Sequence, residues 1–184
     1  MNLIINANPK DDTRSLSAAL SLRLAERLEG QTQMIRIYES DQKYFHYQHN
    51  QEWINLVVSA QSIILPVQMW NFTIPAALKD FFDKITKQGQ LWELSSDQRF
   101  IGLLKDRPVY VIMTSGLDYP PGSPQDFVVP YLKVFFEFLG IRNLKDFRVG
   151  HVANSARLIT DHRYMEEKSQ AMFKAFGLLN EDQV

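Results

Sequence analysis

The sequence predicts an α/β fold, a doubly wound sheet of five parallel strands with helices on both faces. Strand-like and helix-like segments alternate along the whole chain, which is the pattern of right-handed β-α-β units. The segment PVYVIMTS at 108–115 is continuously apolar, as expected of a strand buried on both faces. The chain has 184 residues and is 45% hydrophobic, enough for a sizeable core, so residues 1–184 are predicted to form one domain.

The first half of the chain supplies three of the strands. They are predicted from short β-rich runs at residues 2–6, 34–38 and 62–67. The first helix is predicted from leucines at every fourth position, at Leu16, Leu20, Leu24 and Leu28. Gly30 ends that helix, and two further helices are predicted near 52–60 and over 75–88, the latter with Pro75 in its first turn.

The second half completes the sheet. After the strand at 108–115, a helix rich in aromatic residues is predicted over 126–140, followed by a strand over 147–152 and a last helix over 160–177. Residues 89–107 form a longer excursion, with a short hairpin expected around LWELSS and FIGLL. With five strands in this alternation, the flavodoxin-like order 2-1-3-4-5 is expected.

Composition and charge exclude several classes of protein. The formal net charge of −1 provides no field that would draw the chain to nucleic acid or to an anionic membrane. The chain lacks cysteine, which excludes disulfides, thiolate catalysis and cysteine-ligated metals, and no HExxH or similar spacing predicts a metal. The N-terminus lacks the features of a signal peptide, and no apolar run approaches the ~18 residues of a membrane span. A cytoplasmic protein is therefore expected.

Three loops are expected to meet at one edge of the sheet. In this kind of sheet ligands bind beyond the carboxyl ends of the strands, at the point where the strand order reverses. The first, second and third loops, named here in chain order, follow the strands that end there, and they span Asn8–Ser17, Gln68–Thr73 and Ser115–Ser123. Each has an unusual composition, and this coincidence predicts a binding site.

The first loop predicts a phosphate site. Ser15 and Ser17 open a helix and Arg14 precedes them, so unpaired N–H groups, two hydroxyls and a guanidinium would face a phosphate together. The alternative is that Thr13 or Ser15 serves only as the N-cap of the helix. The loop contains neither GxxxxGK[ST] nor GxGxxG, so a P-loop nucleotidase and a dinucleotide Rossmann fold are not supported.

The second loop predicts a shelf for a flat heterocycle. Met69 and Trp70 supply a sulfur and an indole that pack well on an aromatic ring, and Asn71 supplies amide donors and an acceptor for its polar rim. A tricyclic isoalloxazine is amphipathic in this sense. The alternative is that Trp70 and Phe72 pack beneath the loop as part of the core.

The third loop predicts a closing wall. Ser115 and Gly116 end a buried strand, where a glycine lets the backbone approach a ligand, and Tyr119 is placed to cover that ligand. The alternative is a simple exposed turn. Because no acidic metal cluster is visible, the three loops together favour a phosphorylated flat heterocycle such as FMN over a mononucleotide that needs a metal.

The motifs of these loops carry a family resemblance. MWNFTIPAALKDFFDKI resembles the segment P-M-[YW]-N-F-x-[IV]-P-x-x-L-K-x-[YF]-[FI]-D of the FMN-dependent NADH azoreductases, a branch of the flavodoxin-like quinone reductases. TSG…PQDFVVPYLKVFFEFLGI is similar to their T-S-x-G-G…D-x-x-x-P-Y-L-x-x-x-[FL]-x-F-[IL]-G-[IL] block, and RSLS resembles their phosphate-binding R-S-x-S. The chain departs from the family at Asn8, where a serine is usual, at Gln68 in place of a proline, and at Leu117-Asp118 in place of a glycine pair.

The resemblance implies a set of cofactor-binding residues and a reaction. The expected FMN-binding residues are Asn8, Arg14, Ser15, Leu16, Ser17, Met69, Trp70, Asn71, Phe72, Thr114, Ser115, Gly116, Leu117 and Tyr119. The implied reaction is a ping-pong cycle in which NADH or NADPH reduces the flavin at N5 and a quinone or azo compound then takes the electrons, with no catalytic side chain. A homodimer is also implied, with Phe127, Tyr131 and residues 89–94 as candidates for contacts between subunits.

Two other functions fit the same fold. A flavodoxin-type carrier would pass single electrons to a protein partner, although such carriers are usually more acidic than a chain of net charge −1. A binding module that has lost its cofactor is the other, because Leu117-Asp118 replaces the glycine pair. A stabilised semiquinone would favour the carrier, whereas rapid NADH oxidation with a quinone would favour the enzyme.

Overall fold

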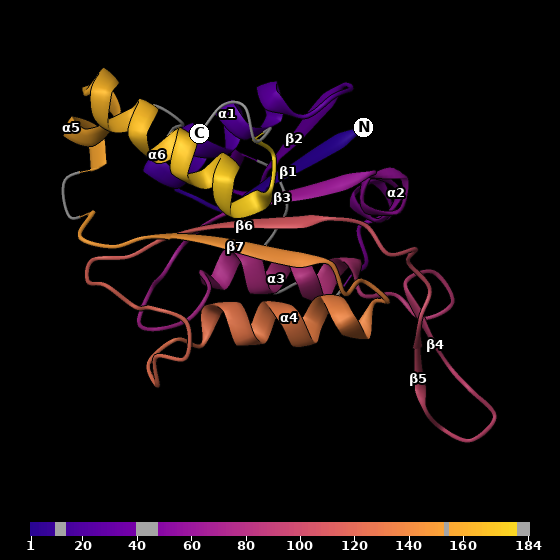
Figure 1. Cartoon of the computed structure of the whole chain (residues 1–184). Coiled ribbons are helices and arrows are strands. Elements are labelled where there is room, and N and C mark those ends of the chain that lie inside the picture. Colours follow the sequence, from indigo (N-terminus) through magenta and orange to yellow (C-terminus); the bar gives the residue numbers. More distant parts are fainter. Residues whose placement is uncertain (10–13, 40–47, 153–154, 180–184) are drawn as a thin grey trace.

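The central sheet is parallel and five-stranded. The computed structural model describes residues 1–9, 14–39, 48–152 and 155–179. The sheet order is β2-β1-β3-β6-β7 (Figure 1), with β1 (Asn2–Asn6), β2 (Thr32–Arg36), β3 (Ser62–Gln68), β6 (Val109–Thr114) and β7 (Leu144–Val149). Because β4 (Trp92–Leu94) and β5 (Phe100–Gly102) form a separate antiparallel hairpin, β6 and β7 are the fourth and fifth strands of the sheet, whose order is 2-1-3-4-5 in those terms. The predicted flavodoxin-like α/β class is confirmed, and so is the hairpin.

Helices cover both faces of the sheet. They are α1 (Leu16–Arg27), α2 (Gln51–Ser59), α3 (Ala76–Ile85), α4 (Val128–Phe138), α5 (Ser155–Thr160) and α6 (His162–Phe176), with a 3-10 turn at Ile37–Glu39. The buried residues of α2, α3 and α4 belong to one core, and those of α1 and α6 to the other. Figure 1 shows α3 and α4 on one side of β6 and β7, and α1 and α6 on the other.

The two cores follow from the alternation of side chains along each strand. In β3, Ile63 and Leu65 point into the core under α2, α3 and α4, whereas Ile64 points into the core under α1 and α6. All three side chains are fully buried. Strands covered on both faces need apolar residues at every position, and this explains the continuous apolar runs in the sequence.

Local signals explain where the helices begin. Ser15, Asn50 and Asp161 each accept a hydrogen bond from a backbone N–H in the first turn of α1, α2 and α6. Pro75 immediately precedes α3, where its fixed φ suits a helix start. Among the described residues no helix is long and apolar enough to cross a membrane.

Two predicted strands were misplaced, and one short helix was not predicted. β2 lies at 32–36 rather than 34–38, because the chain turns into the 3-10 segment at Ile37. β7 lies at 144–149 rather than 147–152, because this edge strand is only half-buried and its charged residues hide the strand pattern. The last helix, predicted over 160–177, is confirmed as α6 at 162–176, where Asp161 is the N-cap, whereas α5 before it was not predicted.

Candidate functional site

The carboxyl ends of β1, β3 and β6 lie side by side, so the three predicted loops meet at one edge of the sheet. Hydrogen bonds join two of these loops to the neighbouring strands. The amide Nδ2 of Asn8 lies 3.5 Å from the carbonyl oxygen of Pro66 at the end of β3, and the Met69 N–H donates to the Thr114 carbonyl at 2.8 Å. The first loop is therefore held against the carboxyl-terminal part of β3, and the second loop against the end of β6. Residues 10–13 of the first loop lie outside the described part of the chain.

The start of α1 combines a helix cap with a small hydroxyl cluster. Ser15 Oγ accepts from the Ala18 N–H at 3.4 Å and lies 3.3 Å from Ser17 Oγ. Both serines are buried, whereas Arg14 is exposed. The N-cap role of Ser15 is confirmed, but it does not use the first backbone N–H groups of the helix, which have no acceptor within the helix itself.

Leu16 contributes to this turn in a different way from its neighbours. Its side chain is fully buried in the core under α1 and α6. Only its backbone can therefore face a ligand, and its side chain serves to hold the first turn of α1 against the sheet.

Asn8 carries an unused acceptor. The side chain is buried, and its Nδ2 donates to Asn6 Oδ1 at 2.9 Å, while its backbone N–H donates to the same oxygen at 3.0 Å. Asn8 Oδ1 itself is buried without a hydrogen-bond partner. An unsatisfied buried acceptor costs about 1–3 kcal/mol, so this oxygen favours any ligand that brings a hydroxyl or amide donor to it.

The second loop is a tight two-residue turn. Trp70 and Thr73 exchange backbone hydrogen bonds of 2.9 and 3.1 Å, and they enclose Asn71 and Phe72. The φ angles of these two residues are 47° and 72°, which is the combination found in a type I′ turn. Asparagine tolerates this region, but for phenylalanine it costs about 1–2 kcal/mol, and such strain is commonly retained at functional sites.

The strained turn exposes its aromatic residues. Trp70 is 45% exposed and Phe72 is 47% exposed, whereas Met69 is partly buried against the core. The alternative that Trp70 and Phe72 pack beneath the loop is therefore wrong. The backbone is fixed and the rings are open to a ligand, which is the arrangement that a binding shelf requires.

The third loop packs beside this shelf. The ring of Tyr119 meets that of Phe72 edge to face, with centroids 6.3 Å apart and an interplanar angle of 84°. Thr114 and Ser115 are buried, and Ser115 Oγ donates to the Leu117 carbonyl at 2.7 Å. The Leu117 side chain is 61% exposed.

Glycine is not required by packing at the start of the third loop. A Cβ added at Gly116 would meet no atom within 4 Å, and its φ is not positive. The space there is open, as the close approach of a ligand to the backbone would need.

A pocket of about 480 Å³ lies on the α3–α4 side of the shelf. Its lining residues are Trp70, Asn71, Thr73, Ile74, Ala76, Lys79 and Tyr131. Among the described residues, its lining includes the second loop and neither of the other two loops. Thr73, Ile74, Ala76 and Lys79 of this lining were not predicted as site residues, although all four lie within the quoted MWNFTIPAALK segment. Tyr131 was predicted only as a candidate for contacts between subunits.

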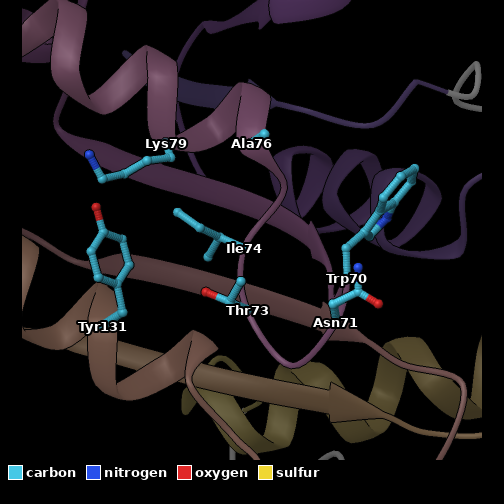
Figure 2. A pocket seen from close by; sticks show the side chains of 7 residues that line it. All are labelled: Trp70, Asn71, Thr73, Ile74, Ala76, Lys79 and Tyr131. Atoms are coloured by element: carbon cyan, nitrogen blue, oxygen red, sulfur yellow. The ribbon is translucent and has the colours of Figure 1, made fainter.

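Two hydrogen-bond donors meet at one end of this pocket. Figure 2 shows the Lys79 amine and the Tyr131 hydroxyl facing each other there, while Trp70 and Asn71 lie at the opposite end. Burial, and next the Asp83 carboxylate, raises the pKa of Tyr131 to about 12, so its hydroxyl keeps its proton at neutral pH. Lys79 Nζ lies 2.6 Å from Asp83 Oδ1, which holds the amine in place.

The described residues give no support for a metal centre. Among them, no group of three or more histidine, cysteine, aspartate or glutamate side chains is placed to hold an ion. The described groups at this edge include hydroxyls, amides, backbone N–H groups and aromatic rings.

Comparisons with known proteins agree with this geometry. A family model described as Flavodoxin-like fold matches residues 2–172. The FMN-dependent NADH:quinone oxidoreductase 2 of Hahella chejuensis is 36% identical over 98 residues, which cover 52% of this chain and 48% of that protein. The chain thus matches about half the length of the first of these relatives. An FMN-dependent NADH:quinone oxidoreductase of Coprothermobacter proteolyticus is 27% identical over 166 residues, 77% of this chain and 82% of the relative.

A solved structure shows the same fold over nearly the whole chain. The FMN-dependent NADH-azoreductase of Bacillus anthracis, crystallised in complex with FMN, superposes with a TM-score of 0.78 at 24% identity, covering 96% of this chain and 97% of that one. The resemblance to azoreductases and quinone reductases stated from the motifs is confirmed. Because the family model matches residues 2–172, this chain belongs to the family described as Flavodoxin-like fold.

Proposed function

We propose that the protein is an FMN-dependent oxidoreductase that passes two electrons from NADH or NADPH to quinones or azo compounds. The observation that carries the proposal is the second loop, where a strained turn holds Trp70 and Phe72 half-exposed at the edge where the neighbouring strands β1, β3 and β6 end. The names of the relatives and of the structural neighbour supply the same chemistry independently.

The residues present fit FMN from its tail to its ring. The first turn of α1 would bind the phosphate through the backbone N–H groups of Leu16 and Ser17, with the Ser15 and Ser17 hydroxyls and Arg14 around it. The unpaired Asn8 Oδ1 would accept a hydrogen bond from a hydroxyl of the ribityl chain.

The ring would lie between the second and third loops. Trp70, Phe72 and Tyr119 offer it aromatic surface, and Asn71 offers an amide for its polar edge. Bound there, FMN would accept a hydride from the nicotinamide and pass the electrons to the acceptor. The chain's own contribution is to orient the ring, exclude water from one face and donate hydrogen bonds to its carbonyl oxygens.

The neighbouring pocket would receive the electron acceptor. Its floor is Ile74 and Ala76, and the donors of Lys79 and Tyr131 lie at one end. A quinone oxygen or an anionic substituent of an azo compound would accept from these groups. Because Tyr131 stays protonated at neutral pH, it acts there as a donor.

We also propose that two copies of the chain associate through α4. Phe127, Tyr131 and Val134 are spaced four and three residues apart, so they lie along one face of this helix. Phe127 is 59% exposed and Val134 is 69% exposed, although both are large and apolar. Val134→Glu should therefore convert a dimer to a monomer in light scattering, while Glu137→Gln on the same helix should leave the mass unchanged.

The test of the proposed activity is a cofactor titration followed by turnover. The protein should bind FMN with quenching of flavin fluorescence, and the complex should oxidise NADH rapidly when a quinone such as menadione is added. Binding without NADH oxidation, together with a stabilised semiquinone, would point to an electron carrier instead. Failure to bind FMN would leave a binding module of the same fold.

A further inference from the structure

We propose that Arg148, on the last strand of the sheet, is a positioning residue that fixes the wall of the flavin site. It acts through the backbone of Tyr119 in the third loop, and its own side chain is not part of the proposed flavin contacts. The inference rests on the proposed function, and it concerns a part of the chain that the motifs of the site do not include. Two independent sets of contacts at the end of β7 carry it.

The guanidinium of Arg148 joins three partners. It donates to Asp126 Oδ2 at 2.8 Å and to the backbone carbonyl of Tyr119 at 2.9 Å through one nitrogen, and its Nε donates to Asp146 Oδ2 at 2.6 Å. The Arg148 side chain is 12% exposed and that of Asp126 only 2%. A planar group with several donors in a fixed fork suits this arrangement, which the single ammonium of a lysine would not reproduce.

Asp126 extends the connection to the second loop. Its other oxygen, Oδ1, accepts from the N–H groups of Val128 and Val129 and so caps α4. The next residue, Phe127, donates its N–H to the Phe72 carbonyl at 3.0 Å. Through Asp126 and Phe127, Arg148 is therefore connected to the backbone of the strained turn.

Arg148 is thus connected to the backbones of Tyr119 in the third loop and of Phe72 in the second loop. Tyr119 is held directly through its carbonyl, and Phe72 indirectly through Phe127. These are the two rings that meet edge to face at the site. A buried ion pair adds little net stability over apolar packing of similar volume. In this proposal its role is to hold the backbones of Tyr119 and Phe127 in one geometry.

Gly150 provides the second, independent observation. A Cβ at this position would lie 2.9 Å from the Cα of Asp118 and 3.0 Å from the carbonyl oxygen of Leu117. The backbone of the third loop therefore rests directly on the end of β7, where only a glycine fits. The Ser115 N–H also donates to the Val149 carbonyl at 3.1 Å.

Arg148 and Gly150 at the end of β7 therefore hold the backbone of the third loop in place. In the proposed complex the flavin would contact the Tyr119 ring of this loop and not the end of β7. Loosening these contacts should let the Tyr119 wall move without unfolding the sheet, because Arg148 belongs to a half-buried edge strand. The change should be visible in the unliganded protein as faster amide exchange in residues 115–127.

The test compares two ways of removing the guanidinium. Arg148→Lys keeps the charge but loses the fork, and Arg148→Met combined with Asp126→Asn removes both charges while keeping an oxygen that can cap α4. Asp146→Asn is the matched control, because it removes another partner of Arg148 that does not contact the third loop. Gly150→Ala is a separate variant, in which the added Cβ would displace the backbone of the third loop at Leu117 and Asp118 while all contacts of Arg148 are kept.

Both Arg148 variants and Gly150→Ala should show faster exchange of the Phe127 amide than wild type. They should also bind FMN about tenfold more weakly, the scale of one charge-assisted hydrogen bond, with an altered visible circular dichroism spectrum. Asp146→Asn should resemble wild type in all three measurements. Far-UV circular dichroism should be unchanged throughout.

The outcomes separate this inference from the proposed function. If wild type binds no FMN, the proposed function fails, and the exchange of the Phe127 amide still decides whether Arg148 holds the loop. If wild type binds FMN and the folded Arg148 variants match its exchange, affinity and spectrum, the positioning role is wrong while the proposed function stands.

Discussion

The first and second loops lie at the same edge of the sheet but differ in which of their groups are exposed. At the start of α1 the polar groups are buried and bonded to one another, as Ser15 and Ser17 show. At the second loop the backbone is bonded and the side chains of Trp70 and Phe72 are left half-exposed. The two serines at the start of α1 are buried beside backbone N–H groups that have no acceptor within the helix, whereas the second loop has a hydrogen-bonded backbone and exposed rings.

The difference shows how a single edge can bind the two ends of one ligand. A phosphate is bound best by backbone N–H groups at a helix start, where burial of the neighbouring hydroxyls fixes their direction. A flat ring is bound best by exposed aromatic surface that does not move when the ligand arrives. The unsatisfied Asn8 Oδ1 lies in the first of these regions, where a connecting polyol would pass.

The largest expected effect comes from the first loop. Arg14→Ala with Ser15→Ala removes two contacts to a phosphate, each of which contributes about 1.5–3 kcal/mol. FMN affinity should fall about a hundredfold or more, measured by fluorescence titration and by retention of flavin after dialysis.

A matched control separates binding from helix stability in this experiment. Asp161 caps α6 as Ser15 caps α1, and Arg163 follows it on the surface. Asp161→Ala with Arg163→Ala should lower the melting temperature through the lost cap but leave FMN bound. Flavin retention unchanged in the Arg14 and Ser15 variant would contradict the phosphate assignment.

The second effect sharpens the contrast between exposed and buried tryptophans. Trp70→Ala should weaken FMN binding by about 1–3 kcal/mol, the scale of stacking on an aromatic side chain, with little loss of stability because the indole is 45% exposed. Trp53, which is 6% exposed in the core under α2, is the opposite case: Trp53→Ala should destabilise the fold by about 3–5 kcal/mol. A Trp70→Ala variant with wild-type flavin absorbance and affinity would exclude the shelf.

The third effect isolates the strain in the second loop. Phe72→Gly and Phe72→Ala both lose the ring, but only glycine adopts a φ of 72° without cost. Phe72→Gly should therefore be more stable than Phe72→Ala by about 1 kcal/mol, or roughly 2–4 °C in melting temperature for a chain of this size. Both should bind FMN more weakly than wild type. Equal melting temperatures would show that the turn is unstrained.

The smallest effect concerns the pocket beside the shelf. The folded protein raises the pKa of Tyr131 from 10.0 to about 12, so it keeps a proton that the unfolded chain releases. This contribution to the unfolding free energy is fully present below pH 10.0 and is lost as the pH rises towards about 12. Burial also raises the pKa values of Tyr110 and Tyr164, so these residues add to the loss of stability at high pH. The contribution of Tyr131 is the part of the fall in unfolding free energy that is absent in Tyr131→Phe. An identical decline in that variant would contradict the assignment.

Much of the fold could be predicted from the sequence because most sheet strands are buried on both faces. Their continuous apolar runs located β1, β3 and β6, and with them the three loops of the site. β7 was misplaced because an edge strand with Lys145, Asp146 and Arg148 shows neither an apolar run nor a clean alternation. Whether a strand lies at the edge depends on the order of all the strands in the sheet, so the sequence of the strand alone does not show it.

The site itself could be predicted in composition but not in conformation. The motif around Met69 indicated which residues gather at the edge, but not that Phe72 adopts a positive φ, since this opposes the intrinsic preference of phenylalanine. The pairing of Arg148 with Asp126 was also beyond prediction, because many carboxylates are available to an arginine and the choice is made by tertiary structure.

The most direct measurement is a crystal structure of the protein grown with FMN. The account predicts that the phosphate lies at the first turn of α1 beside Ser15 and Ser17, and that the ring lies against Trp70, Phe72 and Tyr119. A structure in which FMN avoids this edge, or in which the edge stays empty at saturating FMN, would contradict it.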